Sequence, residues 1–354
     1  MKKKILLAFD DPGGGLAVSS LIENINKEII SDQIIYAGKL SRRFLNEEYS
    51  ENAEMTEISS FIDKEEADEI IEKDKPDMII TGTGGGNAEQ ELRNSAFRKN
   101  IKSIVILDYW KDYSRRWKYA DHSFEEMKDI IFVMDEQTRE EMILENFKKE
   151  NIVITGHPYL DKIFKNYPES SKDKTSDKRI RNILFLSQPL EIIGVKEYVT
   201  HPLEIFLKAI TQISFSAQEK LTVKIKLHPS EQKSEEITAI SKKYNRDLIE
   251  VEIISEENSL SELIKSSELA AGYNTIALFE ARALGKRVIS LKVAEIKNSL
   301  NQAMINAGIE ITGANHESII ECINTNKFET FDIKKFSGGI ENCLKVIKKE
   351  LSIN

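Results

Sequence analysis

The sequence predicts an α/β protein built from two doubly wound domains, each with a parallel sheet. Three observations support this prediction. Short apolar runs alternate with amphipathic segments almost to the end of the chain, a polar segment interrupts that alternation at residues 166–178, and the alternation then restarts. A length of 354 residues suits two domains better than one. We therefore expect two Rossmann-like domains that face each other across a cleft.

The apolar runs of the first half have the length of buried strands, and Gly, Asp or Asn bounds each of them. They are Lys4–Phe9, Gln33–Ala37, Met78–Thr81, Ile101–Leu107, Ile130–Met134 and Ile152–Thr155. The amphipathic segments between them, such as Glu65–Lys73, Ala88–Lys99 and Glu136–Lys148, predict helices. This order is typical of βαβ units, whose strands are parallel.

The domain boundaries follow from where this alternation stops. Residues 1–165 are predicted to form the N-terminal Rossmann-like domain, and the polar, proline-containing residues 166–178 a linker. Residues 179–335 are predicted to form the second Rossmann-like domain, with strands at Asn182–Leu186, Leu221–Leu227, Ile249–Ile254, Glu268–Gly272 and Arg287–Leu291. The last segment, residues 336–354, predicts a helix that crosses back and packs on the N-terminal domain.

Composition excludes several classes of protein. A net charge of −9 argues against a nucleic-acid-binding surface, which needs a basic field. The two cysteines, Cys322 and Cys343, form neither a disulfide framework nor a metal-ligand pattern, so we expect a cytoplasmic protein without a metal or cofactor. The apolar run before Asp10 is too short for a signal peptide or a membrane span. Peripheral contact with a membrane and a homodimer both stay open.

The segment from Ala271 to Gly285 predicts a nucleotide-binding element, because a strand end is followed by a small-residue turn and a helix. A helix that opens at Asn274 and Thr275, just after Tyr273, directs free backbone N–H groups and its positive dipole end at a phosphate. Glu280, near the middle of that helix, can accept hydrogen bonds from a ribose diol.

Two further strand ends of the second half carry candidate phosphate ligands. His228, which precedes Pro229, follows the strand Leu221–Leu227 and can donate to the same phosphates; the alternative is a hydrogen-bonded structural histidine. Ser187 and Gln188 follow the strand Asn182–Leu186, where they either hold a phosphate or form a simple turn. With the Ala271–Gly285 segment they predict a pocket for a nucleoside mono- or diphosphate sugar.

In the first half, Asp10-Asp-Pro-Gly-Gly-Gly15 follows the first strand and opens the first helix. Gly13 and Gly14 allow close backbone approach to a ligand or to the facing domain, although the segment is neither a Walker A nor a GxGxxG sequence. The alternative is a tight turn with a helix-capping aspartate. We place Asp10 in the cleft and take Asp11 as a candidate catalytic base.

Two more loops follow strands of the first half. Gly84 and Gly85 belong to a stretch with more glycines than a turn needs, which predicts contact with an acceptor or with the closing domain. Asp108 opens the next loop and is either a second candidate base or a structural cap. The residues after it that can stack on a sugar or pair with an anionic acceptor, or else pack in a surface loop, are Tyr109, Trp110 and Arg115.

The whole chain resembles the GT-B group, which comprises glycosyltransferases with two Rossmann-like domains and their relatives, the hydrolysing UDP-N-acetylglucosamine 2-epimerases. Asp129–Glu136 followed by Asn151–Asp161 looks like the end of a GT-B N-terminal domain, and lipid-A-disaccharide synthases carry a similar Gly-His-Pro. Lys226–Pro229 and Tyr273–Thr275 resemble the paired motifs that hold the cytidine nucleotide's phosphate in bacterial sialyltransferases and CDP-glycerol glycerophosphotransferases. The Asp10-Asp11 pair, followed here by Pro12, is similar to the acidic motif of the sialyltransferases.

This resemblance implies a metal-independent glycosyltransferase that moves a sugar from a nucleotide-activated donor, such as a CMP-nonulosonic acid, to a glycan, lipid-linked or protein acceptor. Asp11 or Asp108 would act as the general base, and His228 with the amides at Asn274–Thr275 would stabilise the leaving phosphate. Two alternatives stay open. One is a sugar-nucleotide 2-epimerase or hydrolase on the same fold, and the other is a non-catalytic subunit that binds a sugar nucleotide.

Overall fold

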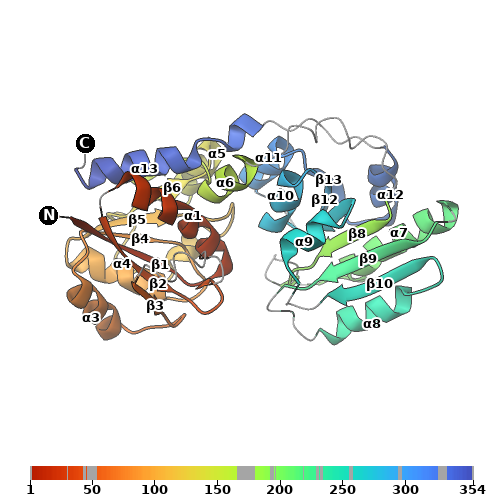
Figure 1. Ribbon diagram of the computed structural model, residues 1–354, viewed down its shortest axis with the longest axis horizontal. Coiled ribbons are helices and arrows are strands. Elements are labelled where there is room, and N and C mark those ends of the chain that lie inside the picture. Colours follow the sequence, from red (N-terminus) through yellow and green to blue (C-terminus); the bar gives the residue numbers. More distant parts are fainter. Residues whose placement is uncertain are drawn as a thin grey trace. The chain divides into compact units, whose positions relative to one another are not determined.

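The computed structural model describes residues 2–29, 31–42, 45, 54–165, 180–191, 195, 197–217, 219–228, 231, 234–254, 258–293, 297–325 and 333–352. The chain divides into two compact units (Figure 1). Unit 1 comprises residues 1–165 and 336–354, and unit 2 comprises residues 166–335. The segment predicted as a linker, residues 166–178, lies outside the described residues.

Unit 1 contains a parallel sheet of seven strands in the order β3-β2-β1-β4-β5-β6-β7. The strands are β1 (Lys3–Phe9), β2 (Ser31–Ala37), β3 (Glu54–Glu57), β4 (Met78–Thr81), β5 (Lys102–Ile106), β6 (Ile130–Val133) and β7 (Ile152–Ile154). The helices are α1 (Pro12–Glu28), α3 (Lys64–Asp74), α4 (Ala88–Arg98), α5 (Glu136–Leu144), α6 (Pro158–Lys165) and α13 (Gly339–Glu350), with short 3₁₀ turns at Ser114–Trp117 and Lys149–Asn151. A third 3₁₀ turn, Ile333–Phe336, spans the boundary between the two units.

The central strand β1 shows why both faces of this sheet are covered. Successive side chains of a strand point to opposite faces. Ile5, Leu7 and Phe9 pack with α1 and α13 on one face, whereas Leu6 and Ala8 pack with α3 and α4 on the other. All five side chains are fully buried. A strand that is apolar on both faces therefore lies between two helical layers, as the doubly wound fold requires.

The C-terminal helix α13 packs against α1 and α6 of unit 1, which confirms the predicted return of the chain (Figure 1). The buried carboxylate of Asp161 accepts the backbone N–H groups of Gly338 at 3.1 Å and Ile340 at 3.0 Å. These N–H groups have no partner within the helix, so Asp161 satisfies the start of α13 from another element. A Cβ atom on Gly339 would lie 3.0 Å from the backbone of His157, so the contact is close.

Unit 2 contains a parallel sheet of six strands in the order β10-β9-β8-β11-β12-β13. The strands are β8 (Asn182–Leu186), β9 (Leu221–Lys226), β10 (Ile249–Ile254), β11 (Leu269–Gly272), β12 (Arg287–Lys292) and β13 (Glu310–Gly313). The helices are α7 (Pro202–Ala217), α8 (Glu235–Tyr244), α9 (Leu260–Lys265), α10 (Ile276–Ala283), α11 (Asn298–Asn306) and α12 (His316–Thr325). The predicted fold class, two Rossmann-like units with parallel sheets, is confirmed.

Each predicted strand is present, but two further strands, β3 and β13, were missed. Both are edge strands of four residues, and each pairs with only one neighbour. Glu54-Met-Thr-Glu57 and Glu310-Ile-Thr-Gly313 lack a continuous apolar run. An edge strand is only partly enclosed, so its sequence need not be apolar throughout. Within the described part of the chain, no helix is long and apolar enough to cross a membrane.

Candidate functional site

Four loops of unit 1 bring polar side chains to one edge of the sheet. Asp11 follows β1, Thr83 follows β4, Asp108 follows β5, and His157 follows β7. The strands are parallel, so all four loops lie at their carboxyl ends. In doubly wound folds ligands bind outside this edge, near the strand where the order reverses, which here is β1.

Asp11 caps the first helix. The helix α1 begins at Pro12, and Oδ1 of Asp11 accepts the backbone N–H of Gly14 at 2.7 Å. Burial and the negative charge of Asp108 raise the pKa of the Asp11 carboxyl to about 6, although the Gly14 N–H and the charge of Arg116 act in the opposite direction. A carboxyl group with such a pKa can exchange a proton near neutral pH.

Asp108 is held by one hydroxyl group and one cation. Its Oδ1 accepts the hydroxyl of Thr83 at 3.0 Å and the guanidinium of Arg116, which also contacts Thr83. The side chains of Asp108 and Arg116 are only 11% and 14% exposed, so little water screens the ion pair. The adjacent residue Arg115, which the sequence suggested, is exposed instead.

Glu89, which the sequence analysis missed, is 5% exposed and lies in the first turn of α4. One of its carboxyl oxygens accepts the backbone N–H of Asp10 at 2.9 Å, and the other accepts that of Gly84. Burial and the charge of Asp11 raise the pKa of Glu89 to about 8, against the effect of the two N–H groups. Acidic residues are common in the first turn of a helix, so the sequence alone offered no signal for this role.

Asp10 lies beside Asp11 and is also partly buried. Its Oδ1 accepts the hydroxyl of Ser60 at 2.9 Å, and its backbone carbonyl accepts the hydroxyl of Ser41. Burial raises the pKa of Asp10, although the Ser60 hydrogen bond lowers it. A Cβ atom on Gly38 would lie 2.4 Å from Oδ1 of Asp10, so the loop after β2 also packs closely on this residue.

The glycines of these loops make room for one another and for the carboxylates. A Cβ atom on Gly13 would lie 2.0 Å from Oδ2 of Asp108, and one on Gly82 would lie 2.8 Å from the Cα atom of Gly14. Gly84 donates to Glu89. Only Gly85 among these positions has open space around its Cα atom, with nothing within 4 Å of a Cβ atom placed there.

The aromatic residues directly after Asp108 are buried or partly buried. Trp110 is 1% exposed, and its Nε1 donates to Oδ2 of Asp135 at 2.7 Å, so it packs in the core and does not face a sugar. Tyr109 is partly buried next to Asp108. Of the two interpretations of Trp110, stacking on a sugar or packing within the loop, the burial of the side chain therefore supports packing.

His157 was also missed as a site residue, although its Gly-His-Pro sequence was noted. Its Nε2 lies 3.0 Å from the backbone carbonyl of Asp108, and the ring is 4% exposed. A carbonyl oxygen only accepts hydrogen bonds, so Nε2 carries the proton and donates. Burial lowers the pKa of His157 and keeps the ring neutral, which suits a residue that orients the Asp108 loop.

In unit 2 the predicted phosphate-binding turn follows β11. Thr275 caps α10, and its hydroxyl accepts the N–H of Ala277 at 3.4 Å. Asn274 adopts a positive φ of 31°, and Ser290 donates its hydroxyl to Oδ1 of Asn274 at 3.2 Å. Tyr273 is fully buried, and Glu280 is half-buried on α10.

A second acid that the sequence did not reveal, Glu231, links the loop after β8 to the loop after β9. It accepts the backbone N–H of His228 at 3.0 Å and the hydroxyl of Ser187 at 3.0 Å. Burial raises the pKa of Glu231. Oε1 of Gln188 is buried without a hydrogen-bond partner among the described residues. Pro229, another predicted ligand, lies outside the described residues. The hydroxyl of Ser187 thus already has an acceptor, which limits it as a phosphate ligand.

The fold has well-defined structural relatives. The chain matches S. aureus MnaA in a co-structure with UDP at 16% identity and a TM-score of 0.68, over 99% of this chain and 98% of that one. The UDP-GlcNAc 2-epimerase of Methanocaldococcus jannaschii matches at 16% identity and 0.68, over 98% and 99%. That of Neisseria meningitidis bound to UDP-GlcNAc matches at 15% identity and 0.65, over 99% and 100%. The fold is the GT-B-like fold of the UDP-GlcNAc 2-epimerases. No protein-family model and no curated protein sequence matches the chain.

These matches correct one prediction. The sequence predicted an enzyme of the glycosyltransferase class, and that prediction is wrong, because several structural neighbours that match the full length of the chain are described as UDP-GlcNAc 2-epimerases. The GT-B-like fold is retained. A likeness of fold or of short motifs does not by itself determine the reaction.

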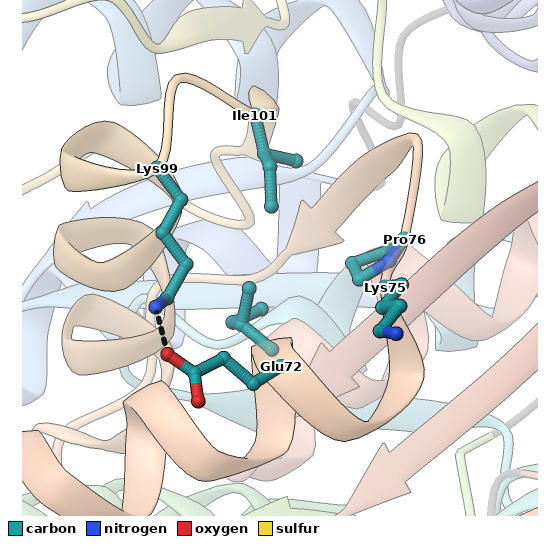
Figure 2. A pocket seen from close by; sticks show the side chains of 6 residues that line it. Glu72, Lys75, Pro76, Lys99 and Ile101 are labelled. Atoms are coloured by element: carbon teal, nitrogen blue, oxygen red, sulfur yellow. Dashed lines mark hydrogen bonds and ion pairs between the residues drawn. The ribbon is translucent and has the colours of Figure 1, made fainter.

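A separate hollow of about 550 Å³ lies in unit 1, away from these loops. Its walls are Ile71, Glu72, Lys75, Pro76, Lys99 and Ile101. Figure 2 shows the ion pair between Lys99 and Glu72, at 2.6 Å, across its mouth. Pro76 lies two positions before β4, and Ile101 immediately precedes β5. The hollow thus lies at the amino ends of the strands, opposite the edge at which ligands bind in this fold. Among the described residues, no group of His, Cys, Asp and Glu is arranged to hold a metal ion.

Proposed function

We propose that this protein is a sugar-nucleotide epimerase that inverts carbon 2 of a UDP-activated N-acetylhexosamine. The observation that carries the proposal is the group of enclosed carboxyl groups at the carboxyl edge of unit 1, on a fold whose solved relatives include UDP-GlcNAc 2-epimerases. Inversion at a carbon atom requires that a proton leaves one face and returns to the other, so it needs an acid and a base of suitable pKa.

Asp11 and Asp108 fit these two roles by their different surroundings. The pKa of Asp11 is raised to about 6 by burial and by the charge of Asp108, so its carboxyl group can take up or release a proton near neutral pH. Asp108 forms an ion pair with Arg116, whereas Asp11 accepts the N–H group that caps α1. Two carboxyl groups whose environments differ in this way are typical of acid–base pairs in enzymes.

Unit 2 supplies the nucleotide-binding part of the proposal. The N–H groups at the start of α10, after Asn274 and Thr275, suit a diphosphate, and His228 ends the strand two places away in the sheet. We assign UDP as the nucleotide because two of the three structural relatives named above are described as complexes with UDP or UDP-GlcNAc. Glu280 is assigned to the ribose diol, as the sequence suggested.

The test is proton NMR of UDP-GlcNAc incubated with the protein in D₂O. We expect a second UDP-sugar, epimeric at carbon 2, with deuterium at that carbon in the product. The Asp108→Asn variant should lose at least about 100-fold in rate, the usual effect of removing an acid–base group. The control is Asp112→Asn in the same loop, because Asp112 is exposed and its positive φ of 56° suits asparagine.

Free UDP in the same spectra distinguishes hydrolysis from epimerisation. UDP that accumulates in step with a free sugar would replace the epimerase by a hydrolase on the same fold. Binding of UDP-GlcNAc without deuterium exchange or a new sugar would overturn the catalytic proposal and leave a sugar-nucleotide-binding protein.

A further inference from the structure

We propose that Glu89 is a positioning residue of the unit 1 site: its protonated carboxyl group ties the loop that carries Asp11 to the loop that carries Thr83. This role goes beyond the acid–base pair proposed above, and only its consequence for catalysis rests on the proposed function.

The first argument is the hydrogen-bonding geometry. The two oxygens of Glu89 accept N–H groups from two different loops, that of Asp10 after β1 and that of Gly84 after β4. Arg93, one turn further along the same helix, donates to the hydroxyl of Thr81 at 2.8 Å and to the carbonyl of Gly82 at 3.1 Å. The first turns of α4 thus hold both loops from their buried side.

The second argument is how closely the two loops pack. A Cβ atom on Gly14 would lie 3.1 Å from Oδ1 of Asp11 and 3.5 Å from Oε1 of Glu89, so both carboxyl groups contact the same glycine. A Cβ atom on Gly82 would meet Gly14 at 2.8 Å and Glu89 at 3.2 Å. The position of Glu89 therefore sets the distance between the loops.

The third argument concerns charge. The charge of Asp11 acts on Glu89 from the loop after β1, Asp10 contacts Glu89 through its backbone N–H group, and Arg93 on its own helix is the positive group that acts on it. Arg116, which pairs with Asp108, acts on Asp11. Two ionised carboxylates against Gly14 would repel each other in an enclosed space, whereas a protonated carboxyl can still accept both N–H groups.

The pKa directions agree with this geometry. The pKa of Asp11 is raised to about 6 and that of Glu89 to about 8, so between these values Asp11 is ionised while Glu89 keeps its proton. An acid whose pKa is raised in the folded state contributes stability below its unfolded pKa and loses it as the pH rises through its folded pKa. Ionisation of Glu89 above about pH 8 should therefore loosen the two loops.

The first experiment does not depend on activity. Thermal unfolding of the wild-type protein, Glu89→Gln and the control Glu91→Gln is measured from about pH 6 to about pH 9. We expect the wild-type protein and Glu91→Gln to lose stability across this range, and Glu89→Gln to lose less. Glu91 lies in the same turn of α4 and is only partly buried, so it tests the substitution itself.

Infrared difference spectra of the same three proteins give a direct view of the proton. We expect the C=O stretch of a protonated carboxylic acid at neutral pH in the wild-type protein and in Glu91→Gln, and its loss in Glu89→Gln. If Glu89→Gln does not fold, the wild-type protein alone provides the test, and its C=O band should disappear between about pH 7 and about pH 9. A wild-type protein without the band at neutral pH would overturn the proposal.

The second experiment uses the epimerase assay. The value of kcat/KM for the wild-type enzyme should fall above about pH 8 by about tenfold per pH unit, the slope of one ionisation. In Glu89→Gln the value of kcat/KM should no longer fall above about pH 8, but it should still fall at acidic pH, where Asp11 becomes protonated. An unchanged alkaline fall in Glu89→Gln would refute the inference while leaving the epimerase intact. Failure of the proposed function would instead show as no turnover with the stability and infrared results preserved.

Discussion

Gly13 and Asp108 lie in contact, although 95 residues separate them in the sequence. A Cβ atom on Gly13 would lie 2.0 Å from Oδ2 of Asp108, which is well inside the van der Waals distance. The first turn of α1 therefore comes close to the Asp108 carboxylate only because position 13 has no side chain. Burial is the main cause of the raised pKa of Asp11, and this contact adds to it because it brings the charge of Asp108 near the helix cap.

The first prediction concerns this glycine. Gly13→Ala should destabilise the protein by about 1–3 kcal/mol, because an extra methyl group is forced into a packed site. Gly85→Ala is the matched control, since nothing lies within 4 Å of a Cβ atom there, and its stability should stay within about 0.5 kcal/mol of the wild type. Urea unfolding of both variants measures the difference. Equal stabilities for the two variants would show that the Asp108 loop can move away freely.

The second prediction concerns Asp11. Asn also caps helices well, so Asp11→Asn should keep α1 in place while removing the titrating group. Because the pKa of Asp11 is raised, the wild-type protein loses stability as the pH rises through about 6, and the variant should be the more stable of the two above that pH. In the epimerase assay the same variant should lose at least about 100-fold in rate.

Asp63→Asn provides the control for that experiment. Asp63 is exposed and caps α3 through the N–H of Glu66, and Asn also caps helices well, so the substitution should change neither the pH dependence nor the rate. A fall in rate equal to that of Asp11→Asn would mean that the assay reports folding. An Asp11→Asn variant with wild-type activity would exclude Asp11 from the chemistry.

The third prediction concerns nucleotide binding by unit 2. UDP at 100 times its Kd should stabilise the protein by about 2.7 kcal/mol. A hydrogen bond to a charged group contributes about 1.5–3 kcal/mol, so His228→Ala should lose most of this stabilisation at the same UDP concentration. Differential scanning fluorimetry with and without UDP measures the shift.

His122→Ala is the control for His228→Ala. The ring of His122 stacks on Phe97 of unit 1 at 4.1 Å, so its removal can lower the melting temperature of the free protein. The shift caused by UDP should nevertheless be unchanged. Equal UDP shifts in His228→Ala and the wild type would remove His228 from the nucleotide site and leave the start of α10 as its remaining part.

Candidate residues could be named from the sequence only where they closely follow a strand. Asp11, Asp108 and Thr275 were named because the ends of apolar runs in a parallel sheet mark the edge at which ligands bind, and their roles stay predictions. Arg116 was missed in favour of Arg115, because which of two adjacent side chains turns inward depends on the 3₁₀ turn at Ser114–Trp117. Within this turn, adjacent side chains point in different directions, so Arg115 is exposed whereas Arg116 pairs with Asp108.

Glu89 and Glu231 could not be found from the pattern, for a related reason. Glu89 contacts the N–H of Asp10, 79 positions earlier, and Glu231 contacts the hydroxyl of Ser187, 44 positions earlier. Each acid follows a loop in a place where solvent-exposed acids are also common. Burial separates these acids from ordinary surface acids, and burial depends on which loops the sheet order brings together.

The sequence by itself determined the parallel α/β fold, the two units and the loops that end at the binding edge, because apolar runs and their spacing are local properties of the chain. The tertiary structure decided which acids are buried, which arginine pairs with Asp108, and which glycines face carboxyl groups. These properties depend on distances between residues that are far apart in the chain. Comparison of the whole fold also overturned the predicted glycosyltransferase class, because solved structures that match the chain over its full length are described as UDP-GlcNAc 2-epimerases.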